Sequence, residues 1–277
     1  MANVLVTNDD GAGADGLRAA ARAAVAAGHR VTVVAPAGNV STFGTALGDF
    51  ADAWHTALPL QAPAGADLAF TMDSYPAAIV ALAALGAFGP RPDFVVSGVN
   101  HGANTGVAVI HSATVAGALT AAMHGIPAVA VSADRGNTPA DWAALQRALE
   151  TILCQDLDGW PTSGALNVNL PAALPADPRD VVWCEPARTG VTVGRLERAT
   201  RPDGSLDLRA AFRSATPMPP EDTDSGALMR GRVTLCWTPV PGAPAPTASW
   251  HGRLVSQVRQ QWPGRPAAGQ ALKDEWS

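Results

Sequence analysis

The sequence has little cysteine and no long hydrophobic run, and both shortages exclude classes of protein. Its three cysteines, Cys154, Cys184 and Cys236, lie far apart, and no CxxC pair occurs. This number and spacing favour buried thiols in a reducing compartment over a disulfide framework or a zinc cluster. No stretch approaches the roughly 18 uncharged apolar residues that a membrane span needs. The brief apolar start lacks a basic leader, so we expect no signal peptide, no membrane partner and a cytoplasmic protein.

Positive charge is also scarce. The formal net charge is -5, and no block of lysines or arginines occurs along the chain. Proteins that bind nucleic acid neutralise its backbone phosphates with such blocks, so the composition disfavours a nucleic acid polymer as the partner. A small site could still hold a single phosphate group through a metal ion.

The first half of the chain alternates short β-branched runs with alanine-rich segments. We predict strands at residues 4–7, 31–35, 94–96 and 128–131, and helices at about 15–27, 76–85, 112–123 and 140–153. Gly28 stands where a helix C-terminal cap is favoured. Continuous apolar strands are typical of a sheet covered by helices on both faces. Strand–helix alternation therefore predicts an α/β fold with a doubly wound, mostly parallel sheet.

The second half has a different pattern, with short strands between turns rich in proline and glycine. We expect strands around residue 168 and at 181–183, 206–208 and 233–237. Prolines and alanines crowd together at 239–246, which indicates a linker or an extended arm. We therefore divide the chain into an α/β core at 1–172 that carries the metal site, a β-rich portion at 173–240 that completes the fold, and a C-terminal arm or tail at 241–277 that could take part in oligomer contacts.

Polar residues follow three of the predicted strands. Asn8-Asp9-Asp10-Gly11 follows the first, residues 36–41 the second, and a loop at 97–106 with Asn100 and Asn104 among glycines the third. The carboxyl ends of parallel strands form one edge of a sheet, where ligands bind. Adjacent carboxylates suit hard cations such as Mg²⁺, Mn²⁺ or Ca²⁺. Taken alone, Asp9-Asp10-Gly11 could equally be an ordinary turn, but the glycine-rich third loop favours a site.

The next predicted helix begins at Ser112-Ala113-Thr114, directly beyond this loop. Hydroxyl groups and free N–H groups at the positive end of a helix dipole can bind a phosphate. Serine or threonine at a helix start is more often a simple N-cap, and the position beyond the third loop is what favours the phosphate interpretation.

Six short motifs then occur in one order along about the first 170 residues. They are Val6–Gly11 (Val-Thr-Asn-Asp-Asp-Gly), Val34–Pro36, Ser97–Gly106 (Ser-Gly-Val-Asn-x-Gly-x-Asn-x-Gly), Ser112–Ala118, Gly125–Ser132 and Asn167–Pro171. Together they resemble the SurE family of metal-dependent 5'/3'-nucleotidases, in a divergent form. The resemblance implies a Rossmann-like core with a β-rich C-terminal extension, which subunits of homodimers or homotetramers often exchange.

The resemblance also implies a ligand set and a phosphate site. One divalent metal ion per subunit, Mg²⁺ or Mn²⁺ and in crystals also Ca²⁺, would be held by Asp9, Asp10, Ser41 and Asn100. Positions that line the family's phosphate site are matched by Asn104, Ser112 and Thr114.

Several polar positions of the family's pocket differ in this chain. Val107 and Ala108 stand where acidic residues are usual, His111 stands in a tyrosine position, and Thr120 replaces an expected glutamate. The metal set survives while neighbouring polar groups are lost. We interpret this as retained metal binding with a changed substrate preference.

The sequence hypothesis is a divalent-metal-dependent phosphomonoesterase that acts on nucleoside monophosphates or similar small phosphomonoesters. Asp9 or Asp10 would orient or deprotonate the attacking water, and Asn104, Ser112 and Thr114 would bind phosphate oxygens. His111 could protonate the leaving group, or could fill a tyrosine's space as a half-buried residue. Three aromatic residues, Phe43, Trp54 and Tyr75, could form an apolar wall for the leaving group, although such residues are more often core.

Two alternatives stay open. One is a phosphatase dedicated to a biosynthetic intermediate that is not a nucleotide, suggested by the altered pocket loops. The other is a non-catalytic metal- or ligand-binding relative, suggested by the lost acidic residues. A dinucleotide-binding Rossmann enzyme is disfavoured, because Asp9 and Asp10 would stand where the pyrophosphate sits and no GxGxxG motif occurs.

Overall fold

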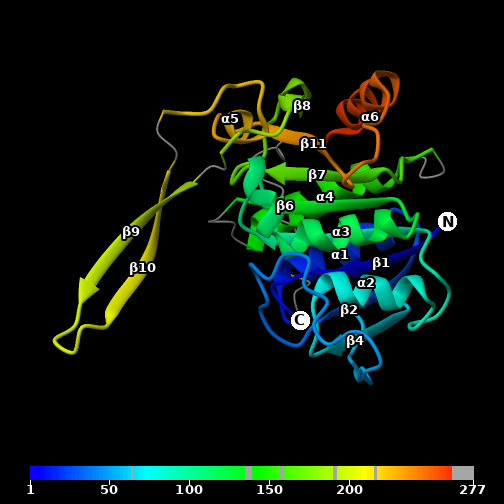
Figure 1. The fold of residues 1–277 in the computed structure, drawn as a ribbon. Helices are drawn as coiled ribbons and strands as arrows, with labels where there is room; N and C mark the ends of the chain where they lie inside the picture. The colour runs from blue at the N-terminus through cyan, green and yellow to red at the C-terminus, as the bar shows by residue number, and fades with distance from the viewer. Residues whose placement is uncertain (64, 135–138, 156–158, 190–191, 215–216, 264–277) are drawn as a thin grey trace.

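The computed structural model describes residues 1–63, 65–134, 139–155, 159–189, 192–214 and 217–263. The strands of its main sheet are β1 (Asn3–Thr7), β2 (Arg30–Pro36), β3 (Ala57–Pro59), β4 (Leu68–Met72), β5 (Phe94–His101), β6 (Ala128–Ala133), β7 (Gly164–Leu170), β8 (Val181–Cys184) and β11 (Val233–Pro239). They lie in the order β3-β4-β2-β1-β5-β6-β7-β11-β8 (Figure 1). Strands β3 and β11 run antiparallel to β4 and β7, and the other neighbours are parallel. The predicted α/β class and mostly parallel sheet are confirmed.

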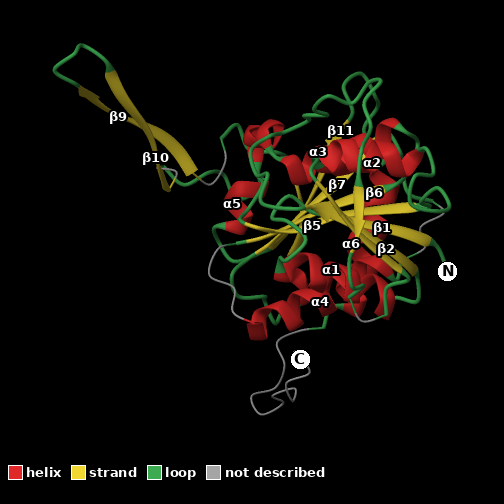
Figure 2. Ribbon diagram, turned by 90° about the horizontal axis from the view of Figure 1, so that it is seen from below, coloured by secondary structure: helices red, strands yellow, loops and turns green. Residues whose placement is uncertain are grey.

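Helices cover both faces of this sheet (Figure 2). On one face lie α1 (Asp15–Ala26) and α4 (Pro139–Leu153), and on the other lie α2 (Pro76–Ala84) and α3 (Ala113–Met123). Successive strand residues point to opposite faces, so Val4 and Val6 of β1 pack toward α1 while Leu5 packs toward α2 and α3. This explains why the central strands are apolar throughout.

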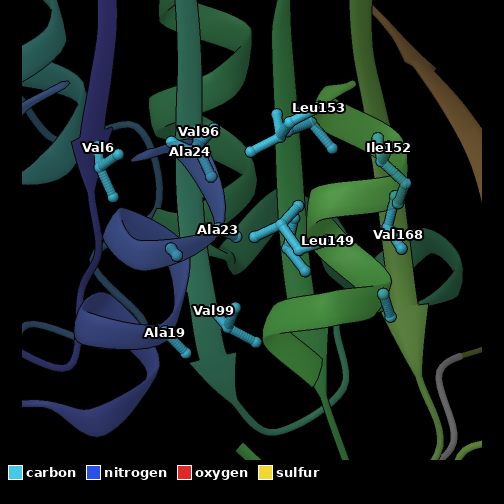
Figure 3. Packing of buried hydrophobic residues seen from close by; sticks show 14 of the residues in the cluster. Val6, Ala19, Ala23, Ala24, Val96, Val99, Leu149, Ile152, Leu153 and Val168 are labelled. Atoms are coloured by element: carbon cyan, nitrogen blue, oxygen red, sulfur yellow. The ribbon is translucent and has the colours of Figure 1, made fainter. Parts of the chain in front are cut away.

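The core beneath α1 and α4 is built from alanine on the first helix and larger residues on the second. In Figure 3, Ala23 and Ala24 of α1 lie along β5, which carries Val96, and Leu149 of α4 lies beside them over the neighbouring strand. Small side chains let α1 approach the sheet closely, and the larger residues of α4 fill the space that remains. The predicted helix cap is also present: Gly28 has φ +83°, and its N–H donates to the carbonyl of Val25 at 2.9 Å.

The β-rich second half contributes to two sheets. Strands β8 and β11 complete the main sheet, whereas β9 (Thr192–Thr200) and β10 (Leu206–Ser214) form a separate antiparallel ribbon. This ribbon projects away from the α/β body (Figures 1 and 2). The short helix α5 (Asp224–Leu228) returns the chain from the ribbon to β11.

The prediction of an arm or tail at 241–277 is wrong for the middle of that segment. Residues Ala248–Gln261 form helix α6, capped by the Thr247 hydroxyl, which accepts a hydrogen bond from the Trp250 N–H. Trp250, Leu254 and Val258, spaced four residues apart on one helical face, are buried in the core beneath the main sheet. Residues 264–277 lie outside the described part of the chain.

Two further expectations concern thiols and membranes. Cys184 and Cys236 are buried and free, and burial raises the pKa of the Cys184 thiol to about 12. Cys154, which we expected to be buried, is exposed because it follows the last residue of α4. Within the residues that the structure describes, no helix has the length and apolar character to cross a membrane.

Candidate metal and phosphate site

The candidate site lies where the order of strands reverses. Strands β1 and β5 are neighbours, and the chain leaves them in opposite directions: β1 continues through α1 to β2 on one side, and β5 through α3 to β6 on the other. Such a switch point opens a crevice outside the carboxyl ends of parallel strands. The segments after β1 and β2 and the end of β5 meet there.

Asp9, in the turn after β1, is the buried member of the carboxylate pair. Its side chain is 3% exposed, and its Oδ1 accepts a hydrogen bond of 2.7 Å from the Thr114 hydroxyl. Burial raises the pKa of the Asp9 carboxyl to about 6; the Thr114 bond lowers it and the neighbouring Asp10 charge raises it. A negative charge is therefore costly at this position unless a cation offsets it.

Asp10 joins the other two segments. Its Oδ1 accepts a hydrogen bond of 3.1 Å from the Asn39 side chain, and its Oδ2 accepts one of 3.0 Å from the His101 backbone N–H. Both carboxylate oxygens are thus held in place by residues that follow β2 and end β5. The carboxylate pair is fixed from three directions, as a preorganised ligand set requires.

Ser41 reaches this edge through its neighbours. The Val40 N–H donates to the Asp9 carbonyl at 2.8 Å, and the Ser41 N–H donates to the Asn39 side chain at 3.0 Å. The segment comes so near that a Cβ atom on Gly11, which has φ +102°, would lie 3.0 Å from the Gly38 carbonyl carbon. Glycine is needed at position 11 because the backbone there has a positive φ and because no Cβ atom fits beside Gly38.

Asn100 lies in a strand, not in the loop that the sequence predicted. β5 continues past Val96 to His101, and its pairing with β6 shifts register between Ser97 and Asn100. A bulge of this kind re-aims the side chains that follow it. The side-chain amide nitrogen of Asn100 donates to the Gly102 carbonyl at 2.6 Å. The side-chain oxygen of Asn100 therefore points away from Gly102 and is left as a possible metal ligand.

Asn104 is held by two asparagines that the sequence analysis quoted without assigning a role. Its carbonyl accepts hydrogen bonds from the side chains of Asn167 at 2.8 Å and Asn169 at 2.9 Å, and its N–H donates to the Asn169 side chain at 2.8 Å. Its own amide donates to the Ser132 hydroxyl at 2.9 Å. The signal was available in the sequence, since two asparagines alternate along the otherwise apolar strand β7.

Ser112 and Thr114 take different positions at the start of α3. The Ser112 hydroxyl accepts the Val115 N–H at 3.1 Å, which is the ordinary N-cap contact that the sequence left open. Thr114 is fully buried, and its hydroxyl is committed to Asp9. Thr114 therefore positions a carboxylate, while Ser112 and the helix terminus remain the phosphate candidates.

The candidate aromatic and histidine residues lie mostly at the surface. His111 ends the 3₁₀ helix η1 (Gly106–His111) and is exposed, so the interpretation of it as a half-buried space filler is wrong. Phe43 contacts Tyr75 with ring centroids 4.9 Å apart, but Trp54 is fully exposed and forms no wall. The exposed His101 ring faces Trp142, with ring centroids 6.2 Å apart.

Asp224 is a buried residue that the sequence analysis missed. It begins α5, and its Oδ2 accepts the Gly106 N–H at 2.8 Å while its Oδ1 accepts the Ala187 N–H at 2.9 Å. Burial raises the pKa of this carboxyl, and the backbone hydrogen bonds oppose that shift. Asp224 thus ties the segment after Asn104 to the chain on both sides of the projecting ribbon.

The oxygen donors at this edge fit a hard divalent cation. Two adjacent carboxylates, one amide oxygen and one hydroxyl are the ligand types that Mg²⁺ and Mn²⁺ prefer. Oδ1 of Asn8, the residue before Asp9, is buried and has no hydrogen-bond partner among the described residues. In that same part of the chain, no three or more His, Cys, Asp and Glu side chains group as metal ligands.

Comparisons with known proteins show which family the chain is similar to. A family model described as "Survival protein SurE" matches residues 4–192. The chain is similar to 5'-nucleotidase SurE from Prochlorococcus marinus (strain MIT 9303), with 36% identity over 186 residues. That alignment covers 65% of this chain and 66% of the relative, just under two thirds of the relative's length.

Two further comparisons cover more of the chain. The 5'-nucleotidase SurE of Chloroflexus aggregans (strain MD-66 / DSM 9485) is 37% identical over 243 residues, which is 86% of this chain and 92% of that protein. The crystal structure of the SurE protein from Aquifex aeolicus has a TM-score of 0.70 and 28% identity, covering 86% of this chain and 93% of the other.

Proposed function

The chain belongs to the SurE family, and from that premise we propose that it is a divalent-metal-dependent phosphomonoesterase. The observation that carries the proposal is the pair Asp9 and Asp10 at the switch point of the sheet, with Asp9 buried and its pKa raised to about 6. A buried carboxylate beside a second one is costly without a cation. The names of the relatives support phosphate monoester hydrolysis, with a nucleoside monophosphate or a similar small phosphomonoester as substrate.

The proposed roles follow from the contacts of each residue. Asp9, Asp10, Ser41 and Asn100 would hold the ion, which would supply Lewis-acid stabilisation of the phosphate charge. Asp9 or Asp10 would orient the attacking water and accept its proton. Ser112 and the first N–H groups of α3 would bind phosphate oxygens, together with Asn104. His111, exposed directly before Ser112, would give a proton to the leaving oxygen.

The test is phosphate release from p-nitrophenyl phosphate and a panel of nucleoside monophosphates, with Mg²⁺, Mn²⁺ or EDTA. We expect release that depends on the metal and falls by at least about 10³-fold in Asp10→Ala. Asp203→Ala, which removes an exposed carboxylate in the turn between β9 and β10, should keep full activity. If the folded wild type releases no phosphate from any of these compounds with either metal, the non-catalytic alternative takes precedence.

We further propose that the protein is a homodimer or homotetramer in the cytoplasm. The ribbon of β9 and β10 exposes Leu196, Leu206 and Leu208, and an isolated two-stranded ribbon is only marginally stable in water. A partner subunit would cover these side chains. Light scattering should give a dimer or tetramer mass, and replacing the ribbon with a short Gly-Ser linker should reduce it. A monomer mass for the wild type would contradict the oligomer.

A further inference from the structure

An apolar groove with a volume of about 600 Å³ runs along the outer face of α3. Ser112, Ala116, Leu119 and Met123 line it from the first turn of this helix to the last. These positions recur every three or four residues, so they form one face of the helix. At 1.5 Å per residue, the groove extends about 16 Å from the candidate phosphate site.

Besides α3, two chain segments line the end of the groove nearest the candidate site, and both of them begin at that site. The segment that carries Ser41 continues into Leu47 and Phe50, and the segment that carries Asn104 continues into Ile110. These two segments meet, because a Cβ atom on Gly44 would lie 3.3 Å from the Ile110 carbonyl. The part of the groove nearest the site is therefore built from the same three segments that form the site, and Ser112 belongs to both. The rest of the lining comes from α2 (Ala81 and Leu85) and from residues 238–241 at the end of β11.

The groove offers little to a polar ligand. No Asp, Glu, Asn, Gln, Lys or Arg is among the described residues that line it. Its polar side chains are His124 and the hydroxyls of Thr45, Ser112, Thr120 and Thr238. Two of these hydroxyls are already engaged: the one on Thr120 donates to the Ala116 carbonyl at 2.8 Å, and the one on Ser112 caps the helix. Leu85, Ile110 and Met123 are each at least 70% exposed along it, which is unusual for side chains of this size.

We propose that this groove binds the leaving group of the substrate, and that the substrate is the phosphate monoester of a largely apolar alcohol. The proposal rests on the phosphomonoesterase function and names its substrate class. Water adds its oxygen to phosphorus, the bond from phosphorus to the alcohol oxygen breaks, and that oxygen takes up one proton. The products are the free alcohol and inorganic phosphate, and no further reactant is needed.

The physical reason is a difference in desolvation. A hydrocarbon chain that leaves water for this groove loses no hydrogen bonds, and it covers leucine, isoleucine and methionine side chains that are otherwise exposed. The ribose hydroxyls and base edges of a nucleoside would lose their bonds to water and find few partners, since the groove has no charged or amide side chain among its described residues and most of its lining is apolar. A nucleotide could still be hydrolysed with its nucleoside in solvent, but it would gain nothing from the groove.

The test is a series of n-alkyl phosphates from butyl to decyl, each below its micelle concentration, with AMP and p-nitrophenyl phosphate measured in parallel. We expect kcat/KM to rise at least about tenfold from butyl to octyl phosphate, mainly through KM, and octyl phosphate to exceed AMP. Met123→Glu, at the far end of the groove, should abolish the rise from butyl to octyl phosphate. Leu58→Glu, which changes an exposed leucine of β3 outside the groove, should retain the rise.

Each other outcome has a separate meaning. Hydrolysis of AMP or p-nitrophenyl phosphate with no dependence on alkyl length would overturn the groove proposal and leave the phosphomonoesterase function intact. No release from any compound would remove both. A change in oligomeric mass for Met123→Glu, with an unchanged preference for long chains, would identify the groove as an interface between copies and also overturn the proposal.

Discussion

The carboxylate of Asp224 accepts a hydrogen bond of 2.8 Å from the backbone N–H of Gly106, a residue 118 positions earlier in the chain. The same carboxylate also accepts the N–H groups of Ala187 and Ser225. One buried side chain thus holds the segment between Asn104 and Ser112 against the base of the projecting ribbon. The shape of the candidate phosphate site depends on a residue that takes no part in binding phosphate.

Asp224→Ala should therefore reduce both stability and activity. Removing the carboxylate leaves buried N–H groups without acceptors, which we expect to lower the free energy of unfolding by roughly 2–4 kcal/mol. Urea denaturation measures the loss, and kcat at saturating substrate should also fall because Gly106 is no longer fixed. Asp203→Ala serves as the control, since that carboxylate is exposed and its hydrogen bonds come from Ser205 in the same ribbon turn. Equal stability of the two variants would contradict the structural role of Asp224.

Thr114→Val should weaken metal binding at neutral pH without disturbing the fold. The substitution keeps the side-chain shape but removes the hydrogen bond that favours the charged form of Asp9. The pKa of Asp9 should rise, so Mn²⁺ binding measured by titration calorimetry should need a higher pH to reach the same affinity. Thr120→Val is the matched control on the same helix, because its hydroxyl donates to the Ala116 carbonyl of that helix and lies outside the carboxylate pair. An unchanged pH profile in Thr114→Val would show that this contact does not tune the carboxylate.

Stability without metal should fall as the pH rises through the titration of Asp9. The carboxyl has a pKa of about 6 in the folded protein against 3.8 in the unfolded chain, so the folded state binds more protons between these values. Its contribution is favourable at low pH and is lost as the pH rises to about 6, a change of roughly 3 kcal/mol. Urea unfolding in EDTA at pH 4.5 and pH 7 should show about 2 kcal/mol of this loss in the wild type relative to Asp9→Asn, since the remainder is already lost below pH 4.5. Saturating Mg²⁺ should restore wild-type stability at pH 7 and have no such effect on Asp9→Asn.

Trp250→Ala should destabilise the protein strongly, by about 3–5 kcal/mol. The ring of Trp250 packs edge-on against three other tryptophans, Trp160, Trp183 and Trp237, with centroid distances of 5.4–6.2 Å. Urea unfolding followed by circular dichroism gives the change. Trp54→Ala is the control with the same change in chemistry, and its fully exposed ring should contribute less than about 0.5 kcal/mol. A small effect at Trp250 would mean that α6 is not part of the cooperative core.

The sequence predicted the parallel core well because each of its central strands is apolar throughout. Consecutive apolar residues such as Val4 and Leu5 indicate a strand that is buried on both faces, and this can be recognised from the local sequence alone. The same pattern failed at the end of β5, where Gly98 and Asn100 look like a loop. Pairing with β6 supplies hydrogen bonds that extend the strand regardless of this local preference.

Helix α6 was missed for the opposite reason. Its average composition is polar, and only a narrow face that includes Trp250 and Leu254 is apolar, so it resembles a surface tail until the tryptophans around it are known. The tertiary roles of Thr114 and Asp224 could not be found either, because each contacts a residue more than 100 positions away. Local pattern placed the carboxylates of the site, whereas long-range contacts determine which side chains hold them.

The position of β11 has a consequence for how the chain is made. Strand β8 has β11 as its only sheet neighbour among the described strands, and β11 lies between β8 and β7 although it is translated last of the three. During synthesis on the ribosome, β8 has no neighbour in the sheet until Val233–Pro239 has emerged. A pause in translation after β11 would give β11 time to pair with β7 and β8. A pause before β11 would leave the edge of β7 unpaired and available to other nascent chains.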